Sequence, residues 1–234
     1  MTTNIAIVIY TMYHHVATLA EEIKKGVEAA GSTATIYQVP ETLDDEILGK
    51  LYAPAKPDYP IATPEVLQAA DGIIFGFPTR FGNLPAQMKA FIDSTGGLWQ
   101  EGKLHHKPAS AFISTGTGGG RETTIVSILS TLTHHGMIYI PLGTITAYAE
   151  LADLSNVHGS SPWGVGTGQD FAIAVAKLTG KDDSKTAAAA PAKETAKPAA
   201  KPAAAAKAPA APSAPAKKQK KKNPLSRLFA KLFH

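Results

Sequence analysis

The chain has no cysteine among its 234 residues and no apolar run long enough to cross a bilayer. Without thiols there can be no disulfide bond, thiol nucleophile or cysteine-ligated metal site. The first residues, MTTNIAIVIYTM, have no basic region before a short apolar run, so they fit neither a signal peptide nor a transmembrane helix. We interpret this run as a buried strand and expect a cytoplasmic protein.

Positive charge is scarce in most of the chain, although the net charge of the whole is +4. Residues 1–181 carry 11 basic and 16 acidic side chains (11 − 16 = −5), whereas residues 182–234 carry 12 and 3 (12 − 3 = +9). The basic character therefore belongs to the tail alone. Nucleic-acid binding by the body is not expected.

Strands alternate with helices in the body. Apolar, β-branched runs predict five strands, near residues 4–10, 33–39, 72–77, 109–114 and 138–140. Helical spacing of apolar residues predicts helices over 16–30, 84–94 and 122–135. Thr63 followed by Pro64 predicts the start of a short helix, which follows a long loop with three prolines. This alternation predicts an α/β fold, a flavodoxin-like doubly wound five-stranded parallel sheet.

The first predicted strand leads into its helix through the polar turn TMYHHVAT, residues 11–18. Amides at the start of a helix lack partners within the helix, and the helix dipole favours negative charge there. A phosphate is the ligand expected at such a turn. The alternative is an ordinary capped turn with two exposed histidines, and this turn taken alone favours that alternative.

The third and fourth predicted strands also end in polar loops. The segment PTRFGNLP at residues 78–85 suits an aromatic ligand held by backbone amides, although an ordinary surface loop fits it equally. The segment STGTGGGRE at 114–122 lacks the lysine of a GxxxxGK[ST] loop and does not fit GxGxxG, so NTP hydrolysis is not expected. Its glycines allow a backbone to approach a flat ring closely. In doubly wound folds ligands bind beyond the carboxyl ends of the strands, where all three loops lie.

Taken together, five motifs carry a resemblance to a known family. They are TMYHHV at 11–16, FGFPTRFGN at 75–83, DSTGGLW at 93–99, STGTGGG at 114–120 and THHGM at 133–137. Over about residues 4–163 the chain resembles the tryptophan-repressor-binding-protein-like (WrbA-type) flavoproteins, which are tetrameric, flavodoxin-like NAD(P)H:quinone oxidoreductases. The resemblance implies FMN as cofactor, NADH or NADPH as co-substrate, a quinone as electron acceptor, and a homotetramer in which a neighbouring subunit completes the pocket.

The resemblance also implies roles for individual residues. The FMN phosphate would be held by Thr11, Met12, Tyr13, His14, His15, Val16 and Thr18. The flavin ring would be lined by Thr79, Arg80 and Phe81, and its polar edge by Ser114, Thr115, Gly116, Thr117, Gly118 and Gly119. Tyr13 would contact the nicotinamide and Trp99 would line the substrate pocket. His134 would lie near the flavin, either as a catalytic proton donor or as a residue that only orders the pocket.

The sequence departs from the family pattern at two places. His14 stands where the family usually has glycine, which puts the phosphate geometry in question if that position needs a positive φ. After Trp163 the connection to the last predicted helix, residues 169–178, is shorter than the family's. We expect this shortening to leave one sheet face poorly covered and to weaken contacts between subunits, which puts activity in question more than the fold. Adjacent histidines occur three times but point in different directions, so no metal site is expected.

The tail divides into two parts after the predicted flavodoxin-like domain of residues 1–181. Residues 182–216 are rich in Ala, Pro and Lys and predict a disordered linker. Residues 217–234 combine a cluster of five lysines at 217–222 with a short amphipathic helix whose apolar side chains are Leu225, Leu228, Phe229, Leu232 and Phe233. This pattern favours a peripheral anchor on an anionic membrane, at the inner face of the plasma membrane. The alternatives are a nuclear-localisation-like run and a partner-binding helix.

Three functions fit these observations. The first is a quinone reductase that delivers two electrons and so avoids one-electron redox cycling. The second is a non-catalytic, membrane-tethered FMN-binding scaffold, which the shortened last helix and the added tail favour. The third is a one-electron flavodoxin carrier, which a body charge of only −5 supports less well.

Overall fold

The computed structural model describes residues 2–116, 118–145, 148, 152 and 161–164. Its five strands are β1 (Asn4–Ile9), β2 (Thr33–Gln38), β3 (Gly72–Pro78), β4 (Pro108–Ser114) and β5 (Ile138–Tyr139). They form one sheet in the order β2-β1-β3-β4-β5, and every neighbouring pair is parallel. This is the doubly wound, flavodoxin-like order that the sequence predicts.

The central strands are apolar on both sides because both faces of the sheet are covered. Along β1, Ile5, Ile7 and Ile9 belong to one core cluster, while Ala6 and Val8 belong to the other. Adjacent residues of a strand point to opposite faces, so a strand buried on both faces has no polar alternation. The continuous apolar run at the start of the chain is therefore confirmed as a buried strand.

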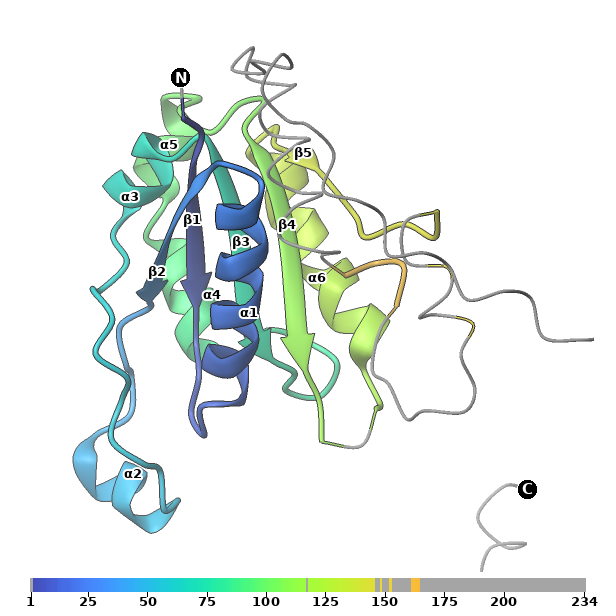
Figure 1. The fold of residues 1–234 in the computed structure, drawn as a ribbon. Helices are drawn as coiled ribbons and strands as arrows, with labels where there is room; N and C mark the ends of the chain where they lie inside the picture. The colour runs from blue at the N-terminus through green and yellow to red at the C-terminus, as the bar shows by residue number, and fades with distance from the viewer. Residues whose placement is uncertain (1, 117, 146–147, 149–151, 153–160, 165–234) are drawn as a thin grey trace, which may run out of the picture. The chain divides into compact units, whose positions relative to one another are not determined.

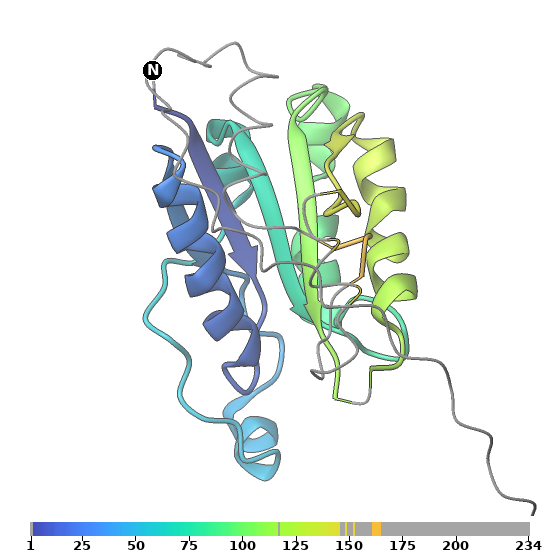
Figure 2. The same cartoon turned by 45° about the vertical axis from the view of Figure 1, so that its right-hand side comes forward.

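The helices lie on both faces of the sheet, as Figures 1 and 2 show. They are α1 (His15–Ala29), α2 (Asp45–Lys50), α3 (Pro64–Ala69), α4 (Ala86–Asp93), α5 (Gly96–Gln100) and α6 (Arg121–His134). Val16, Ala20 and Val27 of α1 pack in the cluster on one face. Met88 of α4 and Ile128 of α6 pack in the cluster on the other face.

The predicted strands and long helices are confirmed with shifts of one or two residues at their ends. Two short helices, α2 and α5, were not predicted. The predicted cap at Thr63 is right in position, because α3 begins at Pro64, but wrong in mechanism, because the Thr63 side chain makes no capping hydrogen bond. The predicted last helix at 169–178, the linker and the amphipathic tail lie outside the described residues, so their boundaries stay predictions.

All neighbouring strands are parallel, as the arrowheads of β1 and β4 illustrate in Figure 1, so one edge of the sheet collects the loops that follow the strands. These are residues 10–14 after β1, 79–85 after β3 and 115–120 after β4, which we call the first, second and third loops. The opposite edge carries α5 and the end of α6. Among the described residues, no helix is long and apolar enough to cross a membrane.

Candidate functional site

The three loops meet around one cavity of about 340 Å³ at the carboxyl edge of the sheet. It is lined by Thr11, Met12, Tyr13, His15, Val16, Pro78, Thr79, Arg80, Ser114, Thr115 and Gly116. In a sheet of order 2-1-3-4-5 the connections leave β1 and β3 in opposite directions, and the crevice between them is the usual ligand site. The cavity lies at this crevice, because the first and second loops follow β1 and β3.

The first loop turns sharply into α1 at His14. This residue has φ 66°, a left-handed conformation that explains why a glycine is usual there. Nε2 of His14 lies 2.8 Å from the carbonyl oxygen of Ala55, and His14 is not among the residues lining the cavity. The start of α1 has no side-chain cap, so the amides of its first turn are left for another acceptor.

The second and third loops pack closely against each other. Oγ1 of Thr79 lies 2.6 Å from Oγ1 of Thr124 and accepts a hydrogen bond from the amide of Gly82, 3.2 Å away. A Cβ at Gly120, where φ is +77°, would lie 3.1 Å from Cα of Gly82 and 3.1 Å from Oγ1 of Thr79. Glycine at this position therefore allows the two loops to meet beside the cavity.

Several predicted cofactor residues do not line this cavity. Besides His14, these are Thr18, Phe81, Gly118 and Gly119, and Thr117 lies outside the described residues. Phe81 has φ 56° and a fully exposed side chain. Oγ1 of Thr18 donates a hydrogen bond to the carbonyl of His14, 3.2 Å away. Thr18 thus contacts the first loop.

Trp99 and His134 lie at the opposite edge of the sheet. Trp99 belongs to α5 and His134 ends α6, and both elements come just before a strand begins (Figure 1). Nε1 of Trp99 donates a hydrogen bond to the carbonyl of His134, 3.0 Å away, and the Trp99 side chain is exposed. A single chain therefore brings these two residues together but does not bring them to the cavity.

His135, the neighbour of His134, is the more buried of the two. Its Nε2 lies 3.0 Å from Oγ1 of Thr95, a buried hydroxyl that itself donates to the carbonyl of Ile92. Its Nδ1 is buried and has no hydrogen-bond partner among the described residues. Burial, with the nearby His134, lowers the pKa of His135. No group of three or more potential ligands for a metal ion occurs in the described part of the chain.

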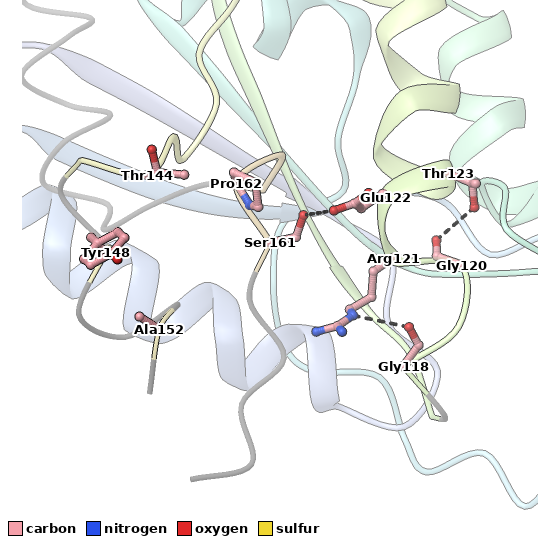
Figure 3. A pocket seen from close by; sticks show the side chains of 10 residues that line it. All are labelled: Gly118, Gly120, Arg121, Glu122, Thr123, Thr144, Tyr148, Ala152, Ser161 and Pro162. Atoms are coloured by element: carbon pink, nitrogen blue, oxygen red, sulfur yellow. Dashed lines mark hydrogen bonds between the residues drawn. The ribbon is translucent and has the colours of Figure 1, made fainter. Parts of the chain in front are cut away.

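A second cavity, of about 600 Å³, lies beside the third loop and the start of α6 (Figure 3). The start of α6 forms one wall, where Nε of Arg121 donates to the carbonyl of Gly118 at 3.2 Å. Oγ of Ser161 donates to Oε1 of Glu122 at 2.9 Å, joining a distant segment to this helix. Tyr148 also lines the cavity. Gly118, predicted as a cofactor residue, lines this second cavity together with Gly120, Arg121 and Glu122, all from the STGTGGGRE segment at 114–122.

A polar cluster that the sequence did not reveal lies behind the first loop. Nζ of Lys56 donates to the carbonyl of Thr11 at 3.0 Å and contacts Oε2 of Glu41 at 2.7 Å. The same ammonium lies 4.8 Å from the centre of the Tyr10 ring. Burial raises the pKa of Tyr10, and the nearby Glu41 carboxylate adds to this effect. Burial alone would raise the pKa of Glu41, but hydrogen bonds from Lys56 and two backbone amides lower it.

The sheet order and the position of the cavity define the chain as a flavodoxin-like protein, a class that binds FMN at the crevice between β1 and β3. The sequence model described as "NADPH-dependent FMN reductase" matches residues 15–149. The chain belongs to this family. It is an FMN-dependent oxidoreductase, with NAD(P)H as co-substrate.

Several relatives are similar to this chain over most of their length. Protoplast secreted protein 2 of Saccharomyces cerevisiae is 59% identical over 164 residues, which cover 70% of this chain and 83% of the relative. NAD(P)H quinone oxidoreductase PST3 of Candida albicans is 58% identical, with 71% and 84% covered. Quinone-oxidoreductase QR2 of Triphysaria versicolor is 55% identical, with 71% and 82% covered.

The residues present at the first cavity fit FMN. The uncapped start of α1 suits a phosphate, because its amides and dipole favour an anion. Gly116, on the opposite wall, has open space where a Cβ would stand, so a flat ring can approach the backbone there. Arg80 adds a cation to the lining.

Proposed function

We propose that this chain is an FMN-dependent NAD(P)H:quinone oxidoreductase that delivers two electrons to a quinone. The observation that carries the proposal is the convergence of the three loops on one cavity at the carboxyl edge of the sheet. The relatives from Candida albicans and Triphysaria versicolor, named as quinone oxidoreductases at 58% and 55% identity, support the substrate class.

The chain's own residues bind and orient the reactants. The first-turn amides of α1, with the Thr11 region, would hold the phosphate of FMN. Arg80 and the amides of the third loop would stabilise negative charge at the polar edge of the ring. Tyr13, which lines the cavity and whose hydroxyl donates to the carbonyl of Leu51 at 3.0 Å, would position the nicotinamide. When bound, FMN would supply the redox chemistry that carries two electrons from NAD(P)H to the quinone, with two protons needed to form the hydroquinone.

We further propose that the working form is a homotetramer in which another copy supplies Trp99 and His134. Within one chain these residues lie at the edge of the sheet remote from the cavity, and Trp99 is exposed. His134 then either exchanges a proton with the substrate or orders the shared pocket. A His134→Gln variant separates the roles: proton exchange predicts a lower kcat with an altered pH profile, whereas ordering predicts a higher KM with an unchanged profile.

A peripheral membrane location remains part of the proposal and rests on the sequence of residues 217–234 alone. Each basic residue near an anionic surface contributes about 1 kcal/mol of binding. Co-sedimentation of the full chain with phosphatidylserine vesicles tests this against a chain ending at residue 216. Equal sedimentation of the two chains would refute the anchor and leave the nuclear-localisation and partner-binding alternatives.

The central experiment is a flavin titration followed by turnover of NADH and NADPH with benzoquinone. We expect FMN to bind and quinone reduction to depend on it. Binding without turnover would instead support the non-catalytic scaffold, while a stable semiquinone during reductive titration would favour a one-electron carrier. Failure to bind FMN would refute all three functions.

A further inference from the structure

The segment between β2 and α3 makes hydrogen-bond contacts with three residues of the first loop. Lys56 reaches the carbonyl of Thr11, Tyr13 donates to the carbonyl of Leu51, and His14 contacts the carbonyl of Ala55. These three contacts lie within 3.0 Å and join two parts of the chain that are about forty residues apart in sequence. The sequence alone gave this segment no role beyond that of a connecting loop.

The Lys56 contact decides how one peptide unit is oriented. In a planar trans peptide the carbonyl of residue 11 and the amide N–H of residue 12 point in opposite directions. The Thr11 carbonyl points to Lys56, which is not among the residues that line the cavity. The amide of Met12 therefore points away from Lys56, and both Thr11 and Met12 line the cavity.

Lys56 is itself held in place by Glu41. Besides Lys56, this carboxylate accepts hydrogen bonds from the amide of Thr42 at 2.9 Å and from Nε2 of Gln87 at 2.9 Å. The amide of Leu43 at 3.2 Å and the hydroxyl of Tyr10 at 3.3 Å complete its environment. Gln87 is buried on α4, so the ion pair is tied to a second element of the core.

The pair positions the loop more than it attracts the phosphate. Glu41 and Lys56 carry opposite charges 2.7 Å apart, so their combined field at the cavity is weak. Lys56 instead fixes the orientation of the Thr11 carbonyl. Its ammonium group is strongly hydrated when free, and here Glu41 and the Thr11 carbonyl take the place of water as fixed partners. Backbone amides of the first loop that are already held in place lose less entropy when a phosphate binds, and this raises the affinity for the phosphate.

We propose that Lys56, held by Glu41, is a positioning residue for the phosphate group of FMN, and that the segment over residues 41–56 thereby sets the preference for FMN over riboflavin. This proposal rests on the assignment of FMN as cofactor. Riboflavin has the same ring as FMN but no phosphate. Comparing the two ligands therefore separates effects on phosphate binding from effects on ring binding.

The test is the pair of dissociation constants for FMN and riboflavin, measured by quenching of flavin fluorescence. For Lys56→Met we expect FMN to bind about tenfold more weakly, about 1.4 kcal/mol, with riboflavin changed less than about twofold. Lys50→Met is the matched control, since Lys50 lies in the same segment, pairs with Glu46 on α2 and is exposed. It should leave both constants unchanged.

Lys56→Met leaves Glu41 without its cation, so a double variant, Glu41→Gln with Lys56→Met, accompanies it. This variant also loses the contact to Thr11 and should show the same loss of preference. If the ratio of the FMN and riboflavin dissociation constants is unchanged in both variants, including the case in which both ligands bind equally more weakly, the positioning role is overturned but the assignment of FMN as cofactor stands. Absence of FMN binding by the unchanged chain would overturn the cofactor assignment and this proposal together.

Discussion

Gly120 offers a sharp test of how the second and third loops are held together. Its φ of +77° places it in the left-handed region, which costs a residue with a Cβ about 1–2 kcal/mol. Its substitution by alanine would also put a Cβ 3.1 Å from both Cα of Gly82 and Oγ1 of Thr79. The Gly82 contact is with backbone, so the second loop itself must shift.

The two costs can be separated with a matched glycine elsewhere. Gly31, just after α1, has φ +79°, and a Cβ there would meet nothing within 4 Å. Gly31→Ala should therefore show the conformational cost alone, about 1–2 kcal/mol. Gly120→Ala should cost about 1 kcal/mol more, since crowding a packed site typically costs 1–3 kcal/mol.

Urea denaturation of the flavin-free chain measures both free energies of unfolding. FMN titration then asks whether the shifted loop reaches the cavity, and we expect weaker binding for Gly120→Ala but unchanged binding for Gly31→Ala. Equal destabilisation by the two substitutions would refute the argument that the second and third loops are in close contact at Gly120.

Three further predictions concern titration and packing. The pKa of Glu41 is lowered in the folded chain, so its contribution to stability is present above the ordinary carboxyl pKa and is lost as the pH falls through the lowered value. The Glu41→Gln variant should therefore lose less stability than the unchanged chain as the pH falls, measured by urea denaturation at pH 3–6. The pKa of His135 is also lowered, so on acidification this histidine is protonated in the unfolded chain before it is protonated in the folded chain, and stability falls as the pH drops below about 6.5. The thermal stability of His135→Gln should lose this pH dependence. An unchanged pH dependence would assign it to other groups. A Cβ on Gly76 would lie 2.2 Å from Cζ of Phe112, so Gly76→Ala should destabilise the chain by about 1–3 kcal/mol, with partial recovery when Phe112→Leu is added; an additive double variant in denaturant unfolding would contradict this contact.

The strands and long helices could be predicted because each buries a regular pattern of side chains. The same reasoning misses α2 and α5 for physical reasons. No residue of α2 is buried, so it has no apolar periodicity, although Asp44 caps it by accepting from the amide of Ile47 at 2.7 Å. α5 begins with two glycines, which are poor helix formers, and its position depends on contacts such as that of Trp99 with the end of α6.

The sequence predicted which loops form the candidate site but not which of their side chains line it. Parallel strands bring their carboxyl ends to one edge, so the three loops had to be neighbours. Which residues face the cavity depends on local backbone angles. The family's usual glycine had raised the question of a positive φ at His14, whereas nothing in the sequence indicated the positive φ of Phe81. Lys56 and Glu41 were missed because contacts between distant segments leave no spacing motif.

The location of the first cavity also bears on the unusual end of the chain. Every residue that lines it lies between positions 11 and 116, well before the shortened connection after Trp163. The second cavity, in contrast, uses Ser161 and Pro162, immediately before that connection. The proposed FMN site is therefore formed without any residue that follows Trp163. Tight FMN binding is compatible with the enzyme and the scaffold alike, and only turnover, which would need Trp99 and His134 from another copy, separates them.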